Sequence, residues 1–210
     1  MTALSKTVFR RTSASLVALS LIGLVTGCST NQLSPSSGNS TNAVTLSSES
    51  SSSITASTSV TALTNKWMKI EKRNRHVDLT LVAEINNSFN FDGYQHGFMI
   101  VTVPKGWLVT IHFQNLGIVT DSAIVLTQAA FTKFLNNGQL PPPAFPTAAT
   151  SSVVQGLSED ITDTFSFRTN QSGRYIILSG VPGHALSGMW IHFNVSNSVT
   201  LPSVTVKKVT

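Results

Sequence analysis

The residues best suited to chemistry lie in one glycine- and proline-rich segment, residues 179–190. His184 stands five positions after Ser179, and Met189 stands five positions after His184. A loop can bring three side chains at this spacing to one point, whereas a straight strand would separate them along its length. A serine beside a histidine raises the question of a catalytic dyad, which needs a third group to orient the histidine as a base. We find no such nucleophile, base and orienter in the sequence and expect no enzyme.

The segments around these residues have the character of β-strands. Apolar and β-branched side chains form short runs, several of them alternating with polar residues, at residues 79–85, 98–103, 109–113, 122–126, 165–167, 175–178 and 189–195. Gly, Pro and Asn separate the runs, a pattern that predicts an antiparallel sandwich or barrel. Helical periodicity is weak and confined to residues 129–135, and the four prolines of residues 139–149 indicate a long loop.

The segment with Ser179, His184 and Met189 resembles the copper loop of the cupredoxins, and closely that of the sulfocyanin family. That family has a Cys, then Gly-Val-Pro-Gly-His-Ala, then Gly-Met, and this chain has Gly180-Val181-Pro182-Gly183-His184-Ala185 and Gly188-Met189-Trp190. Residues 91–94, 103–107, 165–167 and 173–175 and the proline-rich loop extend the resemblance to roughly residues 80–197. The resemblance implies an all-β, cupredoxin-like Greek-key β-sandwich, and it implies copper-dependent electron transfer as the ordinary role of the family.

The same resemblance marks where this chain departs from the family. A blue copper site is built from two His, one Cys thiolate and a weak axial Met. Ser179 stands where the family has its Cys, and Asp121 stands where it has its first His. The metal ligand positions of this chain are then Asp121, Ser179, His184 and Met189. Because a serine hydroxyl stays protonated and is a poor ligand for Cu(I), we expect copper affinity to fall by many orders of magnitude.

Three functions are compatible with this set of residues. The first is an accessory or binding module of an envelope redox or copper-handling system, which keeps the sandwich without blue copper. The second is the electron transfer of the family, with copper held by other ligands. The third is a weak Cu(II) site through Asp121 and His184, because carboxylate and imidazole both suit Cu(II).

Without a tightly held metal, the four residues are expected to have structural roles. If Asp121 is buried beside His184, the two can form an ion pair that replaces the metal as a link between segments. Met189 is expected to fill the core, and Ser179 to bond nearby backbone.

The start of the chain has the features of an export signal. In residues 1–27, Lys6, Arg10 and Arg11 precede an apolar stretch that is too short to span a bilayer. Residues 24–28, Leu-Val-Thr-Gly-Cys, resemble a bacterial lipobox, which implies cleavage before Cys28 and lipid attachment to its sulfur. Cys28 is the only cysteine, so no internal disulfide is expected. We interpret residues 28–65 as the lipidated Cys with a Ser/Thr-rich flexible tether, and residues 66–210 as the folded domain.

The charge balance argues against nucleic-acid binding. Of the 14 basic residues, three lie in the signal segment, which leaves 11 against 9 acidic residues and a net charge of +2. A nucleic-acid-binding domain needs a much stronger basic field. We therefore expect no nucleic-acid partner. Together with the export signal, the sequence leads us to expect an exported, lipid-anchored monomer at the periplasmic side or the cell surface. Its expected partners are membrane lipid and an envelope redox protein.

Composition also bears on the response to pH. Charged residues make up 11% of the chain, against about 25% in ordinary soluble domains. Acid finds few carboxylates to protonate on such a surface, so the composition indicates a protein that loses little stability at low pH. His112 and His192 both fall on the polar phase of their strands and are predicted to be surface residues.

Overall fold

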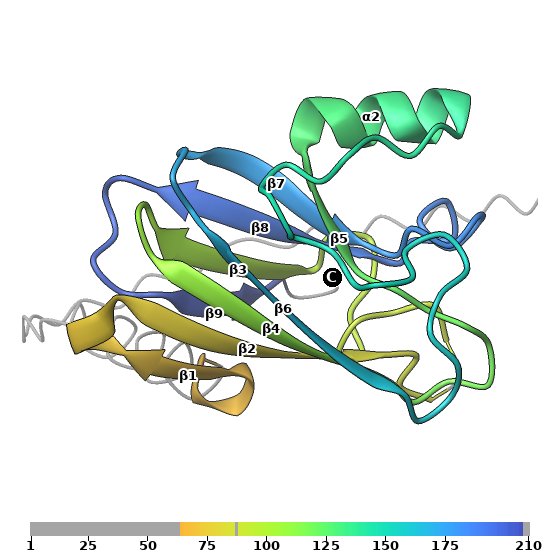
Figure 1. Cartoon of the computed structure of the whole chain (residues 1–210), viewed down its shortest axis with the longest axis horizontal. Helices are drawn as coiled ribbons and strands as arrows, with labels where there is room; N and C mark the ends of the chain where they lie inside the picture. The colour runs from red at the N-terminus through yellow and green to blue at the C-terminus, as the bar shows by residue number, and fades with distance from the viewer. Residues whose placement is uncertain (1–63, 87, 208–210) are drawn as a thin grey trace, which may run out of the picture. The chain divides into compact units, whose positions relative to one another are not determined.

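Two β-sheets packed face to face form the part of the chain that the structure, a computed structural model, describes: residues 64–86 and 88–207 (Figure 1). The first sheet has the order β1-β2-β4-β6, with β1 at Met68–Glu71, β2 at His76–Ala83, β4 at Leu108–Asn115 and β6 at Thr162–Arg168. The second has the order β5-β7-β8-β3-β9, with β5 at Ile124–Thr127, β7 at Gly173–Leu178, β8 at Trp190–Ser196, β3 at Met99–Pro104 and β9 at Ser203–Val206. A short 3₁₀ helix spans Lys72–Asn74, and helix α2 spans Gln128–Asn137. The all-β sandwich predicted from the sequence is confirmed.

Two of the strand pairs are parallel, which corrects the purely antiparallel arrangement expected from the short strands. β2 pairs in parallel with β4, and β3 pairs in parallel with β8. The reason is that the chain changes sheets after β2: β3 belongs to the second sheet, so β4 returns to lie beside β2 in the same direction. Local sequence patterns carry no information about such long-range crossings.

The main core fills the space between the two sheets, and its side chains come from alternate positions of the strands. Val77, Leu79 and Leu81 of β2 are fully buried, while the residues between them are half-buried or exposed. From the other sheet, Val101, Ile191 and Phe193 are likewise fully buried in this core. The alternation agrees with a sheet that has one face on the core and one face outward.

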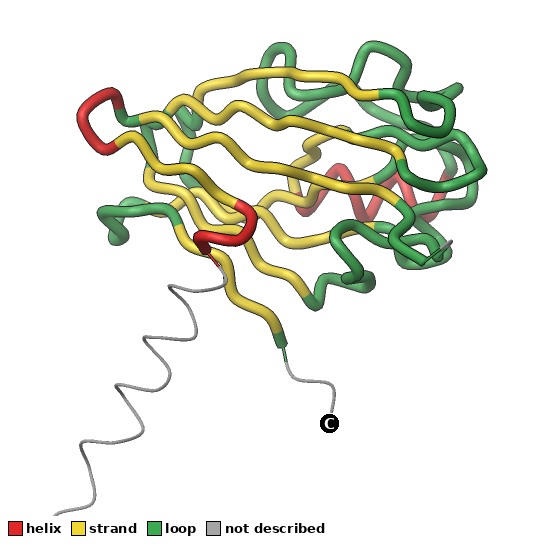
Figure 2. Tube along the Cα trace, turned by 90° about the horizontal axis from the view of Figure 1, so that it is seen from below, coloured by secondary structure: helices red, strands yellow, loops and turns green. Residues whose placement is uncertain are grey.

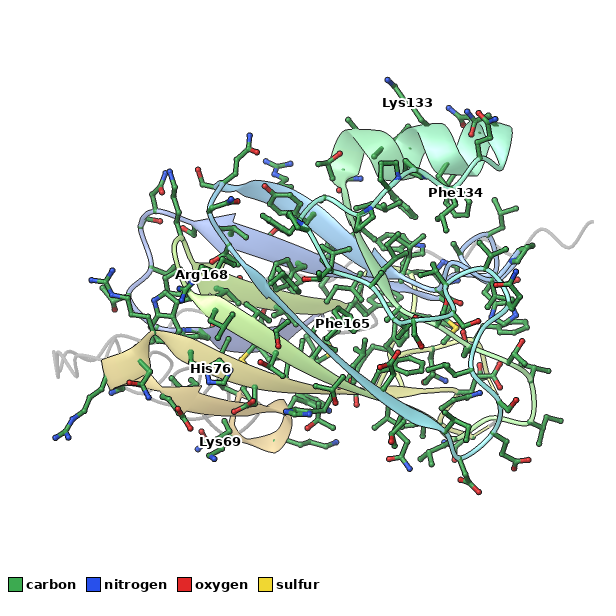
Figure 3. The ribbon with its side chains drawn as sticks, in the orientation of Figure 1. Lys69, His76, Lys133, Phe134, Phe165 and Arg168 are labelled. Atoms are coloured by element: carbon green, nitrogen blue, oxygen red, sulfur yellow. The ribbon has the colours of Figure 1, made fainter. Side chains whose placement is uncertain are left out.

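Helix α2 covers the outer face of the second sheet and makes a second, smaller core. Phe131 and Phe134 of the helix pack with Leu126 of β5 and with Ile176 and Leu178 of β7. Figure 3 shows Phe134 directed toward the sheet and Lys133 directed away from it. Strand β7 is therefore buried on both faces over its second half, which explains its uninterrupted apolar sequence.

The proline-rich segment after α2 runs as a loop along the free edge of β5. Ala144 N–H donates to Val125 O at 2.8 Å, and Val125 N–H donates to Ala148 O at 3.0 Å. Phe145 inserts from this loop into the core and stacks on Phe167, with ring centroids 5.2 Å apart. The loop thus covers a sheet edge that would otherwise present unpaired backbone groups.

Long loops gather at one end of the sandwich, on the right of Figures 1 and 2. Asp121 lies in the loop between β4 and β5, and His184 lies in the loop between β7 and β8. At the start of the described chain, Thr64 already accepts a hydrogen bond from Val204 N–H at 3.0 Å. The predicted signal, residues 1–27, Cys28 and nearly all of the predicted tether lie outside the described residues. Within residues 64–86 and 88–207, no helix is long and apolar enough to cross a membrane.

Candidate metal centre

The loop between β7 and β8 folds into successive tight turns that hold its polar residues close together. Ser179 N–H donates to Met189 O at 3.2 Å, and Met189 N–H donates to His184 O at 3.0 Å. Gly188 has a φ of +99°, and a Cβ at this position would collide with the ring of His96. Any other residue there would therefore be strained and would clash, so this glycine is what allows the loop to close. The loop links the backbones of Ser179, His184 and Met189 directly.

Asp121 reaches the same place from a distant part of the sequence. Its backbone forms an isolated β-bridge with Leu157, with Asp121 N–H donating to Leu157 O at 3.0 Å and Leu157 N–H donating back at 2.7 Å. The next residue fixes the loops to one another, because Gly180 N–H donates to Ser122 Oγ at 2.9 Å and Ser122 Oγ donates to Val153 O at 2.7 Å. The carboxylate of Asp121 is thereby held against the β7–β8 loop.

Three of the four predicted ligand residues meet at one oxygen atom. Asp121 Oδ1 accepts a hydrogen bond from Ser179 Oγ at 2.7 Å and lies 3.1 Å from His184 Nδ1. The third separation, between Ser179 Oγ and His184 Nδ1, is 3.4 Å. The hydroxyl donates to this oxygen, and a His184 tautomer with its proton on Nδ1 places a second donor beside it.

Burial makes these contacts strong and leaves one atom unsatisfied. Asp121 and Ser179 are completely buried, and His184 is 8% exposed. Charge-assisted hydrogen bonds in such surroundings are stronger than those at a surface. The second carboxylate oxygen, Asp121 Oδ2, is also buried but has no hydrogen-bond partner among residues 64–86 and 88–207. This atom therefore keeps an unused pair of electrons within the site.

The fourth predicted residue, Met189, belongs to the hydrophobic core and is completely buried. Ser179 differs from its expected role, because its hydroxyl donates to the Asp121 carboxylate rather than to backbone. The hydroxyl oxygen also lies 3.4 Å from Val181 N–H, a long contact. The residue that accepts the hydrogen bond of Ser179 is Asp121, which is 58 positions away in the sequence.

Two residues that sequence reasoning missed complete the surroundings. The ring of Phe89 lies on His184, with centroids 4.4 Å apart and planes tilted by 43°. Glu84 is 4% exposed, and its pKa is raised by burial and by the nearby negative charge of Asp121, while His184 acts in the opposite direction. Glu84 directly follows β2 and packs on Gly117, where a Cβ would collide with the Glu84 side chain. No pattern around residues 84–89 identifies either residue as part of a site.

The predicted surface histidines have different outcomes. His112 is exposed on β4, as expected. His192 is half-buried: its ring contacts the edge of Trp190, with centroids 5.4 Å apart, and burial lowers its pKa, helped by the positive charges of Lys207 and Arg174. The alternation of β8 placed His192 on the outer face correctly, but the segment around Gly97 covers that face.

A two-sheet β-sandwich with a Gly-Val-Pro-Gly-His loop between two neighbouring strands is the architecture of a cupredoxin domain. The family model described as "Sulfocyanin (SoxE) domain" matches residues 63–206, so the chain belongs to the sulfocyanin family. It is 29% identical over 136 residues to the sulfocyanin of Sulfolobus acidocaldarius, covering 61% of this chain and 68% of the relative.

Solved structures give more distant similarities. Auracyanin A, a "blue" copper protein from Chloroflexus aurantiacus, is 20% identical, with 58% of this chain and 99% of that chain covered and a TM-score of 0.40. Reduced rusticyanin is 16% identical, with 66% and 92% covered and a TM-score of 0.42.

Proposed function

We propose that this sulfocyanin-family protein is a non-blue accessory or binding module of an envelope redox or copper-handling system, and not an enzyme or a blue copper carrier. The observation that carries the proposal is the contact of Ser179 Oγ, His184 Nδ1 and Asp121 Oδ1 within 2.7–3.4 Å of one another. In this arrangement the hydrogen bonds between the loops perform the structural task that a metal ion performs in a copper site.

The donors at this place do not fit type 1 copper. Such a site needs a thiolate and two imidazoles, whereas a hydroxyl, a carboxylate and one imidazole meet here. The only cysteine of the chain is Cys28, which lies outside the folded domain that the family match covers. The hydroxyl of Ser179 is also already engaged as a donor to Asp121, so it is not directed at an ion.

The same geometry argues against hydrolytic chemistry. In a catalytic triad the serine donates to the histidine, and the carboxylate holds the other ring nitrogen. Here Ser179 Oγ and His184 Nδ1 both contact the same oxygen of Asp121. Complete burial of the hydroxyl also keeps it from any substrate.

Exposed apolar side chains around the site support a binding role. Ile118 is 73% exposed in the loop that leads to Asp121, and Leu186 is 70% exposed two residues after His184. Because Asp121 and His184 are in contact, their two loops are neighbours, and Ile118 also lines a surface hollow with Phe89, which lies on His184. Large apolar side chains exposed at a protein surface are a feature of interaction sites, so we assign this end of the sandwich to an envelope partner.

Addition of Cu(II) tests the proposal. We expect the full chain carrying Cys28→Ser, which removes the only thiol, to show no intense thiolate-to-copper absorption at any copper ratio. Visible spectroscopy with calorimetry measures this, and His184→Ala and His76→Ala are measured in parallel to locate any weak binding. An intense blue or green colour with one copper per chain would refute the proposal.

A second candidate function is a weak Cu(II) site at Asp121 and His184. The unpartnered Oδ2 of Asp121 favours it, because a buried carboxylate oxygen without a hydrogen bond is costly unless a cation or water satisfies it. In the same titration, a weak, broad band that is lost in His184→Ala and kept in His76→Ala would establish this site. Silence by both methods would leave the accessory module as the function.

We also propose that Cys28 holds the protein at the outer face of a membrane. One acyl chain gives only marginal membrane binding, at about 0.8 kcal/mol per buried methylene, and two or more give a stable anchor. The full chain is expected to stay in the membrane fraction after a high-salt wash and to be released by detergent, whereas Cys28→Ser moves to the soluble fraction. Thr30→Ala, a nearby change that leaves the thiol in place, serves as the matched control, and a Cys28→Ser protein that remained in the membrane would contradict the anchor.

A further inference from the structure

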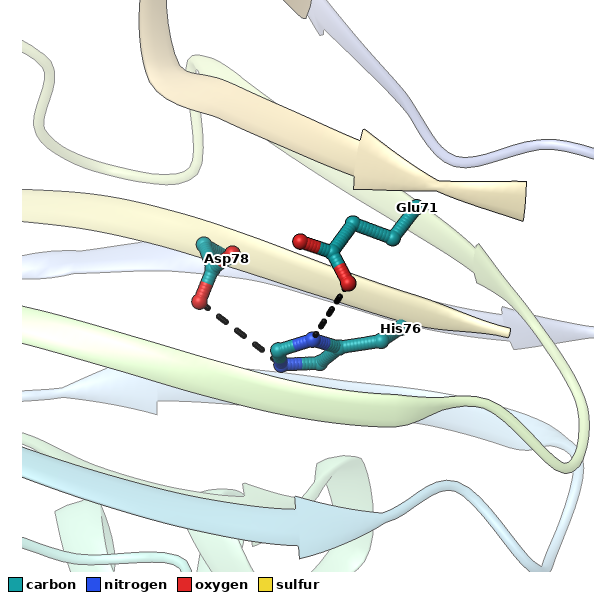
Figure 4. A group of neighbouring side chains, drawn as sticks. All are labelled: Glu71, His76 and Asp78. Atoms are coloured by element: carbon teal, nitrogen blue, oxygen red, sulfur yellow. Dashed lines mark ion pairs between the residues drawn. The ribbon is translucent and has the colours of Figure 1, made fainter. Parts of the chain in front are cut away.

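A second group of ionisable side chains lies on the outer face of the first sheet, where β1, β2 and β4 run side by side. Glu71 of β1 is the register partner of His76 of β2, and Asp78 follows His76 on the same face. Glu71, His76 and Asp78 each offer a ligand atom, and these atoms all lie within 4.8 Å of one another (Figure 4). The cluster is separate from the Asp121 site, because β2 begins at His76 and ends one residue before Glu84, a length of about 25 Å.

Each ring nitrogen of His76 lies near a carboxylate oxygen. Its Nδ1 lies 3.7 Å from Glu71 Oε2, and its Nε2 lies 3.6 Å from Asp78 Oδ1. A neutral imidazole carries one N–H and one lone pair. Nε2 also lies 2.9 Å from Thr110 Oγ1, a hydroxyl that accepts from an Nε2–H or donates to an Nε2 lone pair. When Nε2 carries the proton, the lone pair of Nδ1 faces Glu71 Oε2. A cation on Nδ1, either a proton or a metal ion, removes this repulsion.

The separations favour a metal ion as the cation. Distances of 3.6 and 3.7 Å are too long for hydrogen bonds. Two ligands that bind one ion tetrahedrally at about 2.1 Å are themselves about 3.4 Å apart. Each of the two nitrogen–oxygen separations of His76 is close to that between two ligands of one metal ion. Because they start from different ring nitrogens, one ion would use either Nδ1 beside Glu71 or Nε2 beside Asp78, and the other carboxylate would complete the ligand set from within 4.8 Å.

Neighbouring groups restrain the three side chains. Asn74 Nδ2 donates to Glu71 Oε2 at 3.3 Å, and Lys69 Nζ lies 3.6 Å from Glu71 Oε1. His112 Nε2 contacts Asp78 Oδ1 at 3.1 Å, and Thr110 Oγ1 lies 2.9 Å from His76 Nε2. The side chains of His76 and Asp78 are only 21% and 22% exposed. Strands hold a site more rigidly than loops do, so little movement is needed to admit an ion.

We propose that Glu71, His76 and Asp78 form a binding site for a divalent ion of the Zn²⁺ and Cu²⁺ class, with His112 as a positioning residue for Asp78. Imidazole combined with carboxylate is the donor set of these borderline ions, whereas Mg²⁺ and Ca²⁺ prefer oxygen ligands alone. Open positions remain for water, because the cluster is partly exposed on the sheet face. Lys69, 78% exposed, is free to turn away when the ion binds.

Titration with Zn²⁺ tests this site in the full chain carrying Cys28→Ser and His184→Ala and no polyhistidine tag. This background removes the thiol and the Asp121 site, so the outcome does not depend on the function proposed above. We expect one Zn²⁺ per chain by calorimetry. Binding should be lost in His76→Gln and in Asp78→Asn and weakened in Glu71→Gln. His112→Ala should weaken it by about 10-fold, the effect of removing an outer partner.

Matched substitutions elsewhere distinguish the cluster from unspecific binding. Glu159→Gln removes an exposed carboxylate, and His192→Gln removes a half-buried imidazole on the other sheet; both should leave Zn²⁺ binding unchanged. Circular dichroism and thermal unfolding confirm that each variant is folded. The proposal would be overturned if Zn²⁺ did not bind, or if a folded His76→Gln protein still bound it. The cluster would then hold no metal ion.

Discussion

The variant Ser179→Cys/Asp121→His is expected to become intensely coloured with copper, while the wild-type site stays colourless. Ser179 Oγ, His184 Nδ1 and Asp121 Oδ1 already lie within 2.7–3.4 Å of one another, close to the separations between ligands that share one ion at about 2.0–2.3 Å. The variant supplies a thiolate and a second imidazole at these positions beside His184. These are the donors that blue copper requires, so copper affinity should rise by several orders of magnitude.

The single variants divide the effect between the two positions. Ser179→Cys should give a weaker coloured complex, because it supplies the thiolate without the second imidazole. Asp121→His should give no thiolate-to-copper band, because no sulfur anion is present. Visible absorption and electron paramagnetic resonance of Cu(II) measure both, in the Cys28→Ser background.

Ser179→Ala/Asp121→Asn is the matched control, since it alters the same two buried positions without adding a copper donor. It should remain colourless. A folded Ser179→Cys/Asp121→His protein that stayed colourless would show that residues 121 and 179 are not placed for a shared ion. The accessory function would then lose its structural basis, because it rests on these being former ligand positions.

How much of this site can be predicted depends on the distance in sequence between its parts. Ser179, His184 and Met189 lie within one loop, and the glycines between them are enough to predict that the loop turns back and brings Ser179 close to His184. Asp121 is 58 residues from Ser179, and only the family resemblance suggested its position. Glu84 and Phe89 could not be predicted, because their proximity to His184 results from how three loops pack together.

Strands can be predicted where their own residues show a clear alternation. Runs with strong alternation, such as Val109 to Phe113, predict β4 and its buried face correctly. Strands β1 and β9 were not predicted, because each has four residues at a sheet edge and too few positions to show a period. Helix α2 shows only weak helical periodicity in the sequence, because its apolar face is narrow. Its first turn is fixed by a cap, in which Thr127 Oγ1 accepts a hydrogen bond from Ala130 N–H.

Buried carboxyl groups are equally hard to recognise from sequence, and Asp92 is the clearest case. It lies in the turn after Phe91 and is 7% exposed. Asp92 Oδ1 accepts a hydrogen bond from Val82 N–H at 3.3 Å, and in the described part of the chain Oδ2 has no hydrogen-bond partner. Burial raises the pKa of this carboxyl to about 7, against smaller opposing effects of the Val82 N–H and of Lys66.

The raised pKa of Asp92 makes the folded protein more stable in acid, in agreement with the tolerance of low pH indicated by the scarcity of charged residues. The unfolded chain ionises this carboxyl near pH 3.8 and the folded chain near pH 7. Below both values the carboxyl is protonated in either state, and the burial penalty is absent. As pH rises from about 4 to 7 the folded state retains a proton that the unfolded state has lost, so stability falls, by about 4 kcal/mol in total.

Asp92→Asn is therefore expected to stabilise the protein by about 2–4 kcal/mol at pH 8 and to change it little at pH 3–4. Asparagine keeps the acceptor for Val82 N–H and tolerates the φ of +54°, but it brings an N–H₂ group to the place where Oδ2 lacks a partner, so the gain stays below the full penalty. Urea unfolding at pH 4, 6 and 8 measures the difference.

Asp160→Asn, an exposed position with a similar φ of +61°, is the control and should follow the wild type at every pH. An Asp92→Asn protein that lost stability at pH 8, or kept the wild-type slope between pH 4 and 7, would show that the Asp92 carboxyl is ionised in the folded protein throughout this range.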